Sequence, residues 1–430
     1  MFFNKEFEAM FSATKNKATH LSNDVVDTKE NKDVVIKVFT AFTGVGSQEM
    51  ALRNANIPFE VVGISEVDKH ALIAYDAIHC SGDVHFPSKE DILKEISEKN
   101  IAYNFSTGKS EIPKKIEELE KLYIAHKRTK NYGDITKIDE NKLPDFDLFT
   151  YSFPCKNISV AGSQAGLEEG SGTQSSLVWE CERIIEAKKP KYLLMENVKN
   201  LVGDKHNDYF MSWVEKLKEL GYNSYHKVLN GKDFGVPQNR ERVMMISIKK
   251  EYDQGCFEMP VGWDLETPLK GILEDEVDEY YYYKKEKYEH LDKPLPHQEV
   301  AFCIDAHYNN SVPIDYFIRK CRRQLVQVGR LNNSDHTANR VYDSNGLCPT
   351  INSMNGGDRE PKMWDSDRIR KLTPLECWRL MGYTDEDFEK AKDAGLPRAR
   401  LYERAGRGIV VPMLEEIFKN LWNAQNENKI

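Results

Sequence analysis

The apolar positions in the first half of the chain form short runs, separated by stretches with helical spacing. Runs rich in β-branched and aromatic residues predict four buried strands, at 34–39, 59–65, 146–150 and 191–195. Apolar residues recur at helical spacing in 48–53 and 176–187. Two longer extended segments, 222–229 and 242–248, predict a hairpin pair. This alternation of strands and helices predicts an α/β fold with an open parallel sheet.

The regularity of the pattern changes along the chain and predicts how the chain is divided. Residues 1–33 are polar and predict an N-terminal extension, whereas 34–255 form the α/β domain, with charged helices inserted at about 85–132. Periodicity is poor over 256–363, where Asn, Ser, Gly and Asp are frequent, so a smaller loop-rich domain is expected there. Helical order returns over 364–430, which is predicted to complete the α/β domain.

Composition excludes several classes of protein. A formal net charge of −9 argues against a protein that coats nucleic acid over its whole surface, although it permits a local basic face. The eight cysteines form no CxxC pair, so neither a zinc site nor a disulfide framework is indicated. No apolar run reaches the roughly 18 residues of a membrane span, and the N-terminus lacks a signal-peptide pattern. We therefore expect a cytoplasmic protein without a metal or a membrane partner.

One local basic cluster lies between residues 317 and 342, which carry six positive side chains and one negative. Asn and Gln side chains are interleaved with its arginines. Arginine, asparagine and glutamine pair with guanine and adenine edges, although a charge cluster is also typical of a solvated face. The candidate DNA contacts in this cluster are Arg319, Arg322, Arg323, Arg330 and Arg340.

The first predicted strand leads through Phe42 into Gly44 and Gly46, and a helix follows. Glycines let backbone approach a ligand, and a helix N-terminus favours a negative group. The spacing does not complete GxGxxG, so an adenosine-type ligand is favoured over a dinucleotide. Glu66 ends the second strand, where an acid suits ribose hydroxyls or caps a helix. Asp134 closes a short element, and its acid either faces the base of the ligand or caps a turn.

The third predicted strand ends at Pro154, and Cys155 follows at the point where strand becomes loop. Ligands of open α/β sheets bind outside the carboxyl ends of the strands, so a thiolate here is a candidate nucleophile. A free cysteine is also often a small buried hydrophobe. The loop that follows Cys155 is rich in small residues, which is typical of a lid or a substrate loop.

Charged residues follow the fourth predicted strand and the hairpin. Glu196 stands at the carboxyl end of the fourth strand beside apolar residues, so a raised pKa is expected, although a helix cap is the alternative. Arg240 and Arg242 alternate in an extended segment and are expected to point the same way. Paired guanidiniums can hold a carbonyl oxygen, a carboxylate or a phosphate, whereas a lone RxR is usually surface.

Taken in order, these segments resemble the DNA (cytosine-5)-methyltransferase family over about residues 34–255 and 345–420. The resemblance is carried by four blocks, namely Phe153-Pro154-Cys155, Glu196-Asn197-Val198, Gln238-Asn239-Arg240-Glu241-Arg242 and Arg370-Lys371-Leu372-Thr373-Pro374-Leu375-Glu376-Cys377. Several ordered blocks together are more specific than any single block.

The resemblance implies a Rossmann-like S-adenosylmethionine-dependent methyltransferase domain with a smaller loop-rich target-recognition domain. It implies a sequence-specific enzyme that methylates carbon 5 of a flipped-out cytosine in double-stranded DNA through a covalent Cys155 adduct. The other catalytic residues that it implies are Glu196, Arg240 and Arg242. It places the cofactor contacts at Phe42, Gly44, Gly46, Glu66, Asp134 and Pro154. We expect a monomer from a bacterial or phage-infected cell, with a cognate restriction endonuclease as a possible partner.

Two positions depart from the usual pattern of the family. Thr40 stands where an Asp is usual, and Gly406-Arg407-Gly408 stands where Gly-Asn-Ser is usual. Two alternatives stay open: a tRNA cytosine methyltransferase with the same blocks, and a DNA-binding protein that has kept the fold without activity. Only the second is supported by the two departures.

Overall fold

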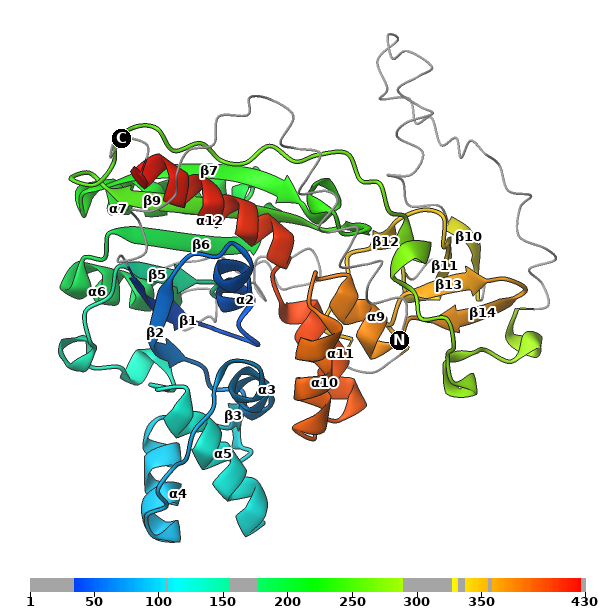
Figure 1. Cartoon of the computed structure of the whole chain (residues 1–430), viewed down its shortest axis with the longest axis horizontal. Coiled ribbons are helices and arrows are strands. Elements are labelled where there is room, and N and C mark those ends of the chain that lie inside the picture. The colour runs from blue at the N-terminus through cyan, green and yellow to red at the C-terminus, as the bar shows by residue number, and fades with distance from the viewer. Residues whose placement is uncertain are drawn as a thin grey trace. The chain divides into compact units, whose positions relative to one another are not determined.

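A computed structural model describes residues 35–104, 107–154, 177–288, 327–331, 337–354 and 358–426 of the 430-residue chain (Figure 1). Cys155, Arg319, Arg322 and Arg323 lie outside these residues, as do the segment 1–33 and the small-residue loop that follows Cys155. The described residues form a six-stranded sheet, a four-stranded sheet and two small two-stranded sheets, with helices between them.

The six-stranded sheet has the order β2-β1-β5-β6-β9-β7. Its strands are β1 (Ile36–Ala41), β2 (Phe59–Ser65), β5 (Leu148–Tyr151), β6 (Tyr192–Val198), β7 (Tyr222–Asn230) and β9 (Glu241–Lys249). The first four in the sheet order are parallel, and β9 is antiparallel to both β6 and β7. The predicted α/β class, the four buried strands and the hairpin pair are confirmed.

Helices α6 (Val178–Lys188) and α7 (Asn207–Glu219) contribute to the main core with the sheet. Phe39, Phe149 and Leu193, from three neighbouring strands, lie in this core because alternate residues of a strand share a face. Cys181 of α6 is buried in the same cluster. Helices α2 (Ser47–Asn54) and α12 (Val411–Asn426) pack against each other, and α12 crosses in front of β6 and β9 (Figure 1).

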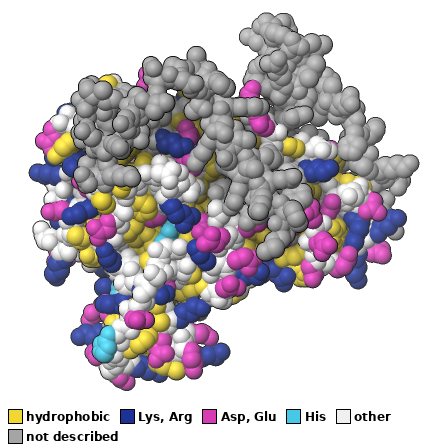
Figure 2. Space-filling model, in the orientation of Figure 1, with side chains coloured by type: hydrophobic (Ala, Val, Ile, Leu, Met, Phe, Trp, Pro, Cys, Tyr) yellow, Lys and Arg dark blue, Asp and Glu magenta, His cyan; other side chains and the backbone are white. Residues whose placement is uncertain are grey.

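The inserted region contains α4 (Lys89–Glu98), α5 (Ile116–Arg128) and a hairpin of β3 (Tyr103–Asn104) and β4 (Lys109–Ser110). The two predicted helices form, but they are not simply exposed. Their apolar faces build a separate core with α3 (Lys69–His79), as the helical period of their apolar residues allows. Lys, Arg, Asp and Glu side chains are mixed over the outer surface of this region (Figure 2).

The second half of the chain contributes the four-stranded sheet, in the order β10-β11-β13-β14. Its strands are β10 (Gln327–Arg330), β11 (Arg340–Asp343), β13 (Lys362–Asp365) and β14 (Arg368–Lys371). Strand β12 (Cys348–Pro349) instead pairs with β8 (Gln238–Asn239), which precedes β9. Strand β13 spans residue 363, the predicted limit of the loop-rich domain, and the division into domains stays a prediction.

The chain then forms α9 (Pro374–Arg379), α10 (Asp385–Asp393) and α11 (Arg398–Arg407) before α12. Thr373 and Glu376 form the predicted capping box at the start of α9. Short 3₁₀ segments complete the described structure, namely η1 (Ile135–Lys137), η2 (Glu140–Lys142), η4 (Lys199–Val202), η5 (Gly231–Phe234), η6 (Leu269–Ile272), η7 (Glu279–Tyr281), η8 (Lys285–Lys287) and η10 (Thr337–Asn339). No helix in the described ranges has the length and apolar character needed to cross a membrane.

Candidate active site

The parallel strands bring the predicted site residues to one edge of the sheet. Ala41 of β1 pairs with Ser65 of β2 and Tyr151 of β5, and Tyr151 pairs with Met195 of β6. The residues that follow these four therefore lie at one level of the sheet, although β6 itself continues to Val198. Phe42, Glu66 and Glu196 come directly after three of them, and Pro154 follows Tyr151 by three residues, so the strand register gathers residues from four separate predicted motifs.

The glycine turn after β1 uses left-handed backbone at Phe42, Gly44 and Gly46, with φ of 57°, 61° and 84°. A Cβ on Gly46 would lie 2.3 Å from Nε2 of His79, so a side chain does not fit there. A Cβ on Gly44 would meet nothing within 4 Å. The turn therefore leaves open space beside Gly44 at the N-terminal end of α2.

Glu66 lies against this turn. Its carboxylate accepts hydrogen bonds from the amides of Gly44 at 2.9 Å and of Val67 and Asp68 at 2.8 Å each. Burial and the neighbouring charge of Asp68 raise the pKa of the Glu66 carboxyl. Asp68, not Glu66, caps α3, because its Oδ1 accepts the amides of His70 and Ala71. The helix-cap alternative for Glu66 is therefore wrong, and its carboxylate faces the glycine turn.

Asp134 has the contacts of a turn cap. Its Oδ1 accepts the amide of Thr136 at 3.0 Å and the hydroxyl at 2.9 Å, and its Oδ2 accepts Nδ2 of Asn100 at 2.7 Å. These bonds fix the short η1 segment, so Asp134 caps this turn, and its contact with the base of a ligand stays a prediction.

The residues before Cys155 are held by a contact that the sequence did not reveal. Asn197 is buried, and its Nδ2 donates to the carbonyl of Phe153 at 3.1 Å. Asn197 stands in one of the four blocks, but a position next to Glu196 does not by itself predict a bond across to β5. This bond joins β6 to the segment that leads into the candidate nucleophile.

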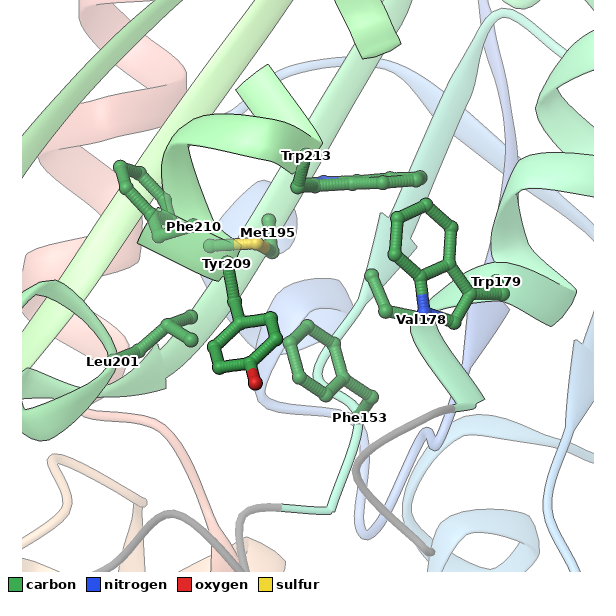
Figure 3. A pocket seen from close by; sticks show the side chains of 8 residues that line it. All are labelled: Phe153, Val178, Trp179, Met195, Leu201, Tyr209, Phe210 and Trp213. Carbon is green, nitrogen blue, oxygen red and sulfur yellow. The ribbon is translucent and has the colours of Figure 1, made fainter. Parts of the chain in front are cut away.

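Aromatic side chains pack around Phe153, close to the end of β5 (Figure 3). Phe153 faces Trp179 of α6 and Tyr209 of α7 across a cavity of about 10 Å³. Nε1 of Trp213 donates to the hydroxyl of Tyr151 at 3.2 Å. A cavity of this size holds about one water molecule, so it is a gap in the core and not a ligand site.

Glu196 forms an ion pair with Arg242, with 3.0 Å between Oε1 and Nε. Both side chains are mostly buried, at 12% and 14% exposed. Burial raises the pKa of the Glu196 carboxyl, as predicted, while Arg242 and Arg240 offset part of this effect. The predicted strand ended at residue 195, before Glu196. Strand β6 instead continues to Val198, because β9 supplies antiparallel partners beyond the end of β5.

Arg240 is directed elsewhere. Its side chain is 2% exposed and donates to the carbonyls of Ile351 at 2.8 Å and of Gly406 and Gly408 at 2.9 Å each. The prediction that Arg240 and Arg242 present a paired fork to one group is therefore wrong. Arg240 is not part of a regular strand, since it lies between β8 and β9, and alternation does not apply there.

The two departures from the family pattern have defined contacts. Thr40 donates its hydroxyl to Oε1 of the buried Glu49 at 2.7 Å. A Cβ on Gly408 would lie 1.9 Å from the hydroxyl oxygen of Tyr383, so only glycine fits there. Arg407 forms ion pairs with Glu403 and Asp68. These contacts show that the chain packs closely around its own residues at both positions.

Two arginines of the basic cluster lie within the described residues. Arg330 of β10 and Arg340 of β11 are direct cross-strand partners. Like charges directly opposite each other destabilise a strand pair unless an anion offsets them. This pairing concentrates positive charge on the four-stranded sheet.

A family model and several known proteins match most of this chain. A family model described as C-5 cytosine-specific DNA methylase matches residues 103–423. Type II methyltransferase M2.ScrFI of Lactococcus lactis subsp. cremoris is 42% identical over 400 residues, covering 91% of this chain and 100% of that protein. Orphan methyltransferase M.SssI of Spiroplasma monobiae is 30% identical over 408 residues, covering 91% and 98%.

Solved structures show the same fold. Dnmt2 methyltransferase of S. pombe has a TM-score of 0.53 at 14% identity, covering 91% of this chain and 98% of that one. The methyltransferase EhMeth of Entamoeba histolytica has a TM-score of 0.54 at 12% identity, covering 92% and 99%. With the matching family model and the 42% identical relative, these findings establish that the chain belongs to the C-5 cytosine-specific DNA methylase family and is a DNA (cytosine-5)-methyltransferase.

Proposed function

We propose that the enzyme methylates cytosine within a specific sequence of double-stranded DNA, through a covalent adduct between Cys155 and a base swung out of the helix. The observation that carries this proposal is the buried ion pair of Glu196 and Arg242. Glu196 lies one residue beyond Met195, which pairs with Tyr151, the last residue of β5. The carboxyl of Glu196 could activate a cytosine ring at one atom, while the guanidinium of Arg242 holds the same ring at another.

The family implies S-adenosylmethionine as the methyl donor, and the residues at the sheet edge fit it. The open space beside Gly44 gives a ligand access to the glycine turn that precedes α2. The Glu66 carboxylate can accept from ribose hydroxyls. Phe42, Gly46, Asp134 and Pro154 are the further residues proposed to hold the cofactor.

The chemistry assigns a task to each catalytic residue. Carbon 5 of cytosine is a poor nucleophile, and addition of a thiolate from Cys155 to carbon 6 gives an enamine that is reactive at carbon 5. Glu196 in its acid form donates to ring nitrogen 3, and Arg242 holds the carbonyl oxygen as negative charge develops. S-adenosylmethionine supplies the methyl group that carbon 5 accepts. Loss of the carbon 5 proton then expels the Cys155 thiolate.

Arg240 takes a different part in this proposal. Because its guanidinium is bonded to the carbonyls of Ile351, Gly406 and Gly408, it supports the position of the neighbouring Arg242. We therefore propose this supporting role for Arg240 in place of the expected direct contact with the cytosine.

The glycine turn provides a prediction with two variants. Gly46→Ala should lower the free energy of unfolding by about 1–3 kcal/mol, because it adds left-handed strain and a clash with His79. Gly44→Ala should cost only about 1–2 kcal/mol, since its Cβ meets nothing. The added methyl group should nevertheless weaken the binding of S-adenosylhomocysteine, because it enters the proposed cofactor space. Urea unfolding and calorimetric titration measure the two effects separately.

The basic cluster provides a second prediction. The double variant Arg330→Gln, Arg340→Gln should bind DNA more weakly, and the slope of log K against log salt should fall by about 0.9 for each phosphate that is no longer neutralised. Lys390→Gln is the control, because its cation pairs with Glu386 on α10. An unchanged salt slope in the double variant would assign both arginines to a solvated face.

Bisulfite sequencing of DNA from cells expressing the protein tests the proposed function directly. Conversion-resistant cytosines should appear within one recurring sequence, because binding of a specific site precedes the chemistry. Cytosines that convert throughout, together with methyl transfer to a tRNA transcript in vitro, would favour the tRNA alternative. The type II relative favours a companion restriction endonuclease for the same site, whereas the orphan relative favours action without one.

A further inference from the structure

A network of buried charges lies behind the acid that is proposed to bind the ribose. Glu66 and Asp68 are two residues apart where β2 ends and α3 begins. Helix α11 supplies Glu403 and Arg404, which are 1% and 2% exposed. Two carboxylates so close together repel each other, and a buried guanidinium needs a partner, so each group depends on the others.

The contacts of Arg404 join two distant parts of the chain. Its Nη2 lies 3.0 Å from Oδ2 of Asp68 and 3.2 Å from Oε2 of Glu403. Arg407, one turn further along α11, lies 2.5 Å from Oε1 of Glu403 and 3.6 Å from Oδ2 of Asp68. Asp68 is thus held by two guanidiniums on one oxygen while its other oxygen caps α3.

This network continues to the glycine turn through backbone. The amide of Asp68 donates to Oε1 of Glu66, and Oε2 of Glu66 accepts the amide of Gly44. The position of Asp68 therefore determines where one of the donors to Glu66 lies. Arg404 contacts Asp68 from α11, the helix that ends at Arg407, where the chain departs from the family pattern.

We propose that Arg404 is a positioning residue of the cofactor site, which holds Asp68 in place and keeps Glu66 able to accept hydrogen bonds from the ribose hydroxyls of the methyl donor. Arg407, which is more exposed than Arg404, is proposed to hold the same oxygen of Asp68 from the solvent side. This inference rests on the proposed use of Glu66 as the ribose-binding acid. It also gives a role to Arg407, which stands where the family usually has Asn.

The charges around Glu66 determine in which direction each variant should shift the pKa of this carboxyl. Burial and Asp68 raise the pKa of Glu66, and Arg404 opposes them. Although burial acts against it, Arg404 and then Arg407 lower the pKa of Asp68. Within the described residues, the other titratable or charged groups of this corner are Lys69 and His70 at the start of α3, and Arg400 and Glu403 on α11.

The test compares the binding of S-adenosylhomocysteine to the full-length protein and its variants between pH 5 and pH 9. In the wild type, affinity should fall as the pH drops through the pKa of Glu66, because only the carboxylate accepts both hydroxyls. Arg404→Met removes a cation, so the fall in affinity should occur at a pH about one unit higher than in the wild type. On the acid side of the profile, this shift corresponds to a Kd about tenfold higher than that of the wild type. Its kcat with saturating cofactor should stay close to that of the wild type.

A second variant should move the profile the other way. Asp68→Asn removes the negative charge next to Glu66 while asparagine still caps α3, so affinity should persist to lower pH. This variant keeps the test decisive if Arg404→Met does not fold. Arg404→Lys keeps the charge and should restore most of the wild-type profile.

Arg400→Met is the matched control, because Arg400 contacts Glu403 at 2.6 Å from the same helix and has no ion pair with Asp68 among the described residues. Its pH profile should match that of the wild type. The proposal is overturned if Arg404→Met and Asp68→Asn both fold and bind with the wild-type pH profile, or if Arg400→Met shifts as much as Arg404→Met. Absence of binding by the wild type would instead contradict the proposed function itself.

Discussion

The variant Cys155→Ser is expected to lose methyl transfer by on the order of 10³-fold or more while it still binds DNA. A serine hydroxyl is ionised far less than a thiol near neutral pH, so it adds poorly to carbon 6 of cytosine. DNA affinity should persist, because phosphate contacts from other residues supply most of it. Transfer of labelled methyl groups to DNA and a gel-shift titration measure the two properties separately.

Cys256→Ser is the matched control, since Cys256 is a free and exposed cysteine whose replacement should change activity little. A second measurement tests the adduct itself. In DNA with fluorine at carbon 5 of the target cytosine, the adduct cannot lose a proton from that carbon, so it should remain bonded to the enzyme. Peptide mapping should find the bond at Cys155 in the wild type. Full activity of Cys155→Ser, or an adduct on another cysteine, would refute the assignment.

The strands and the edge at which they end could be predicted because local pattern determines both. The strand 59–65 could be predicted from its own apolar and β-branched residues, without knowledge of distant partners. Glu66 is the next residue, so its place at the strand end could be predicted as well. Strands β1, β2 and β5 end at one level in the register, which β6 passes at Met195, so the motifs at this level lie near one another. The raised pKa of Glu196 follows from the same reasoning, because an acid beside a buried strand is desolvated.

What could not be predicted depends on contacts between distant segments. Arg240 bonds to Gly406 and Gly408, which lie 166 and 168 residues away, and no local spacing indicates such partners. Strand β6 continues past Glu196 only because β9 enters the sheet beside it, and the hairpin pattern does not say where the hairpin docks. Asp68 and Arg404 are 336 residues apart, so their pairing appears only in the folded chain.

The variant Glu196→Gln should reduce kcat by on the order of 10²-fold to 10⁴-fold, while the affinity for S-adenosylhomocysteine changes little. Glutamine occupies the same space but cannot transfer a proton to ring nitrogen 3. The wild-type carboxyl has a raised pKa, so its acid form is present below that pKa and is lost as pH rises through it. Wild-type kcat should therefore fall on the alkaline side, and this fall should be absent from the residual activity of Glu196→Gln.

Glu241→Gln separates this effect from a general loss of charge near Arg242. Glu241 is the residue before Arg242 and pairs with Lys199 at 2.9 Å, but its side chain is 42% exposed and carries no proposed task. Its kcat and pH profile should match those of the wild type. Because Glu196→Gln leaves Arg242 without its anionic partner, thermal unfolding of each variant is needed beside the kinetics. Equal losses of kcat and cofactor affinity in Glu196→Gln, with a lowered Tm, would make Glu196 a structural partner of Arg242 and not the acid that activates the base.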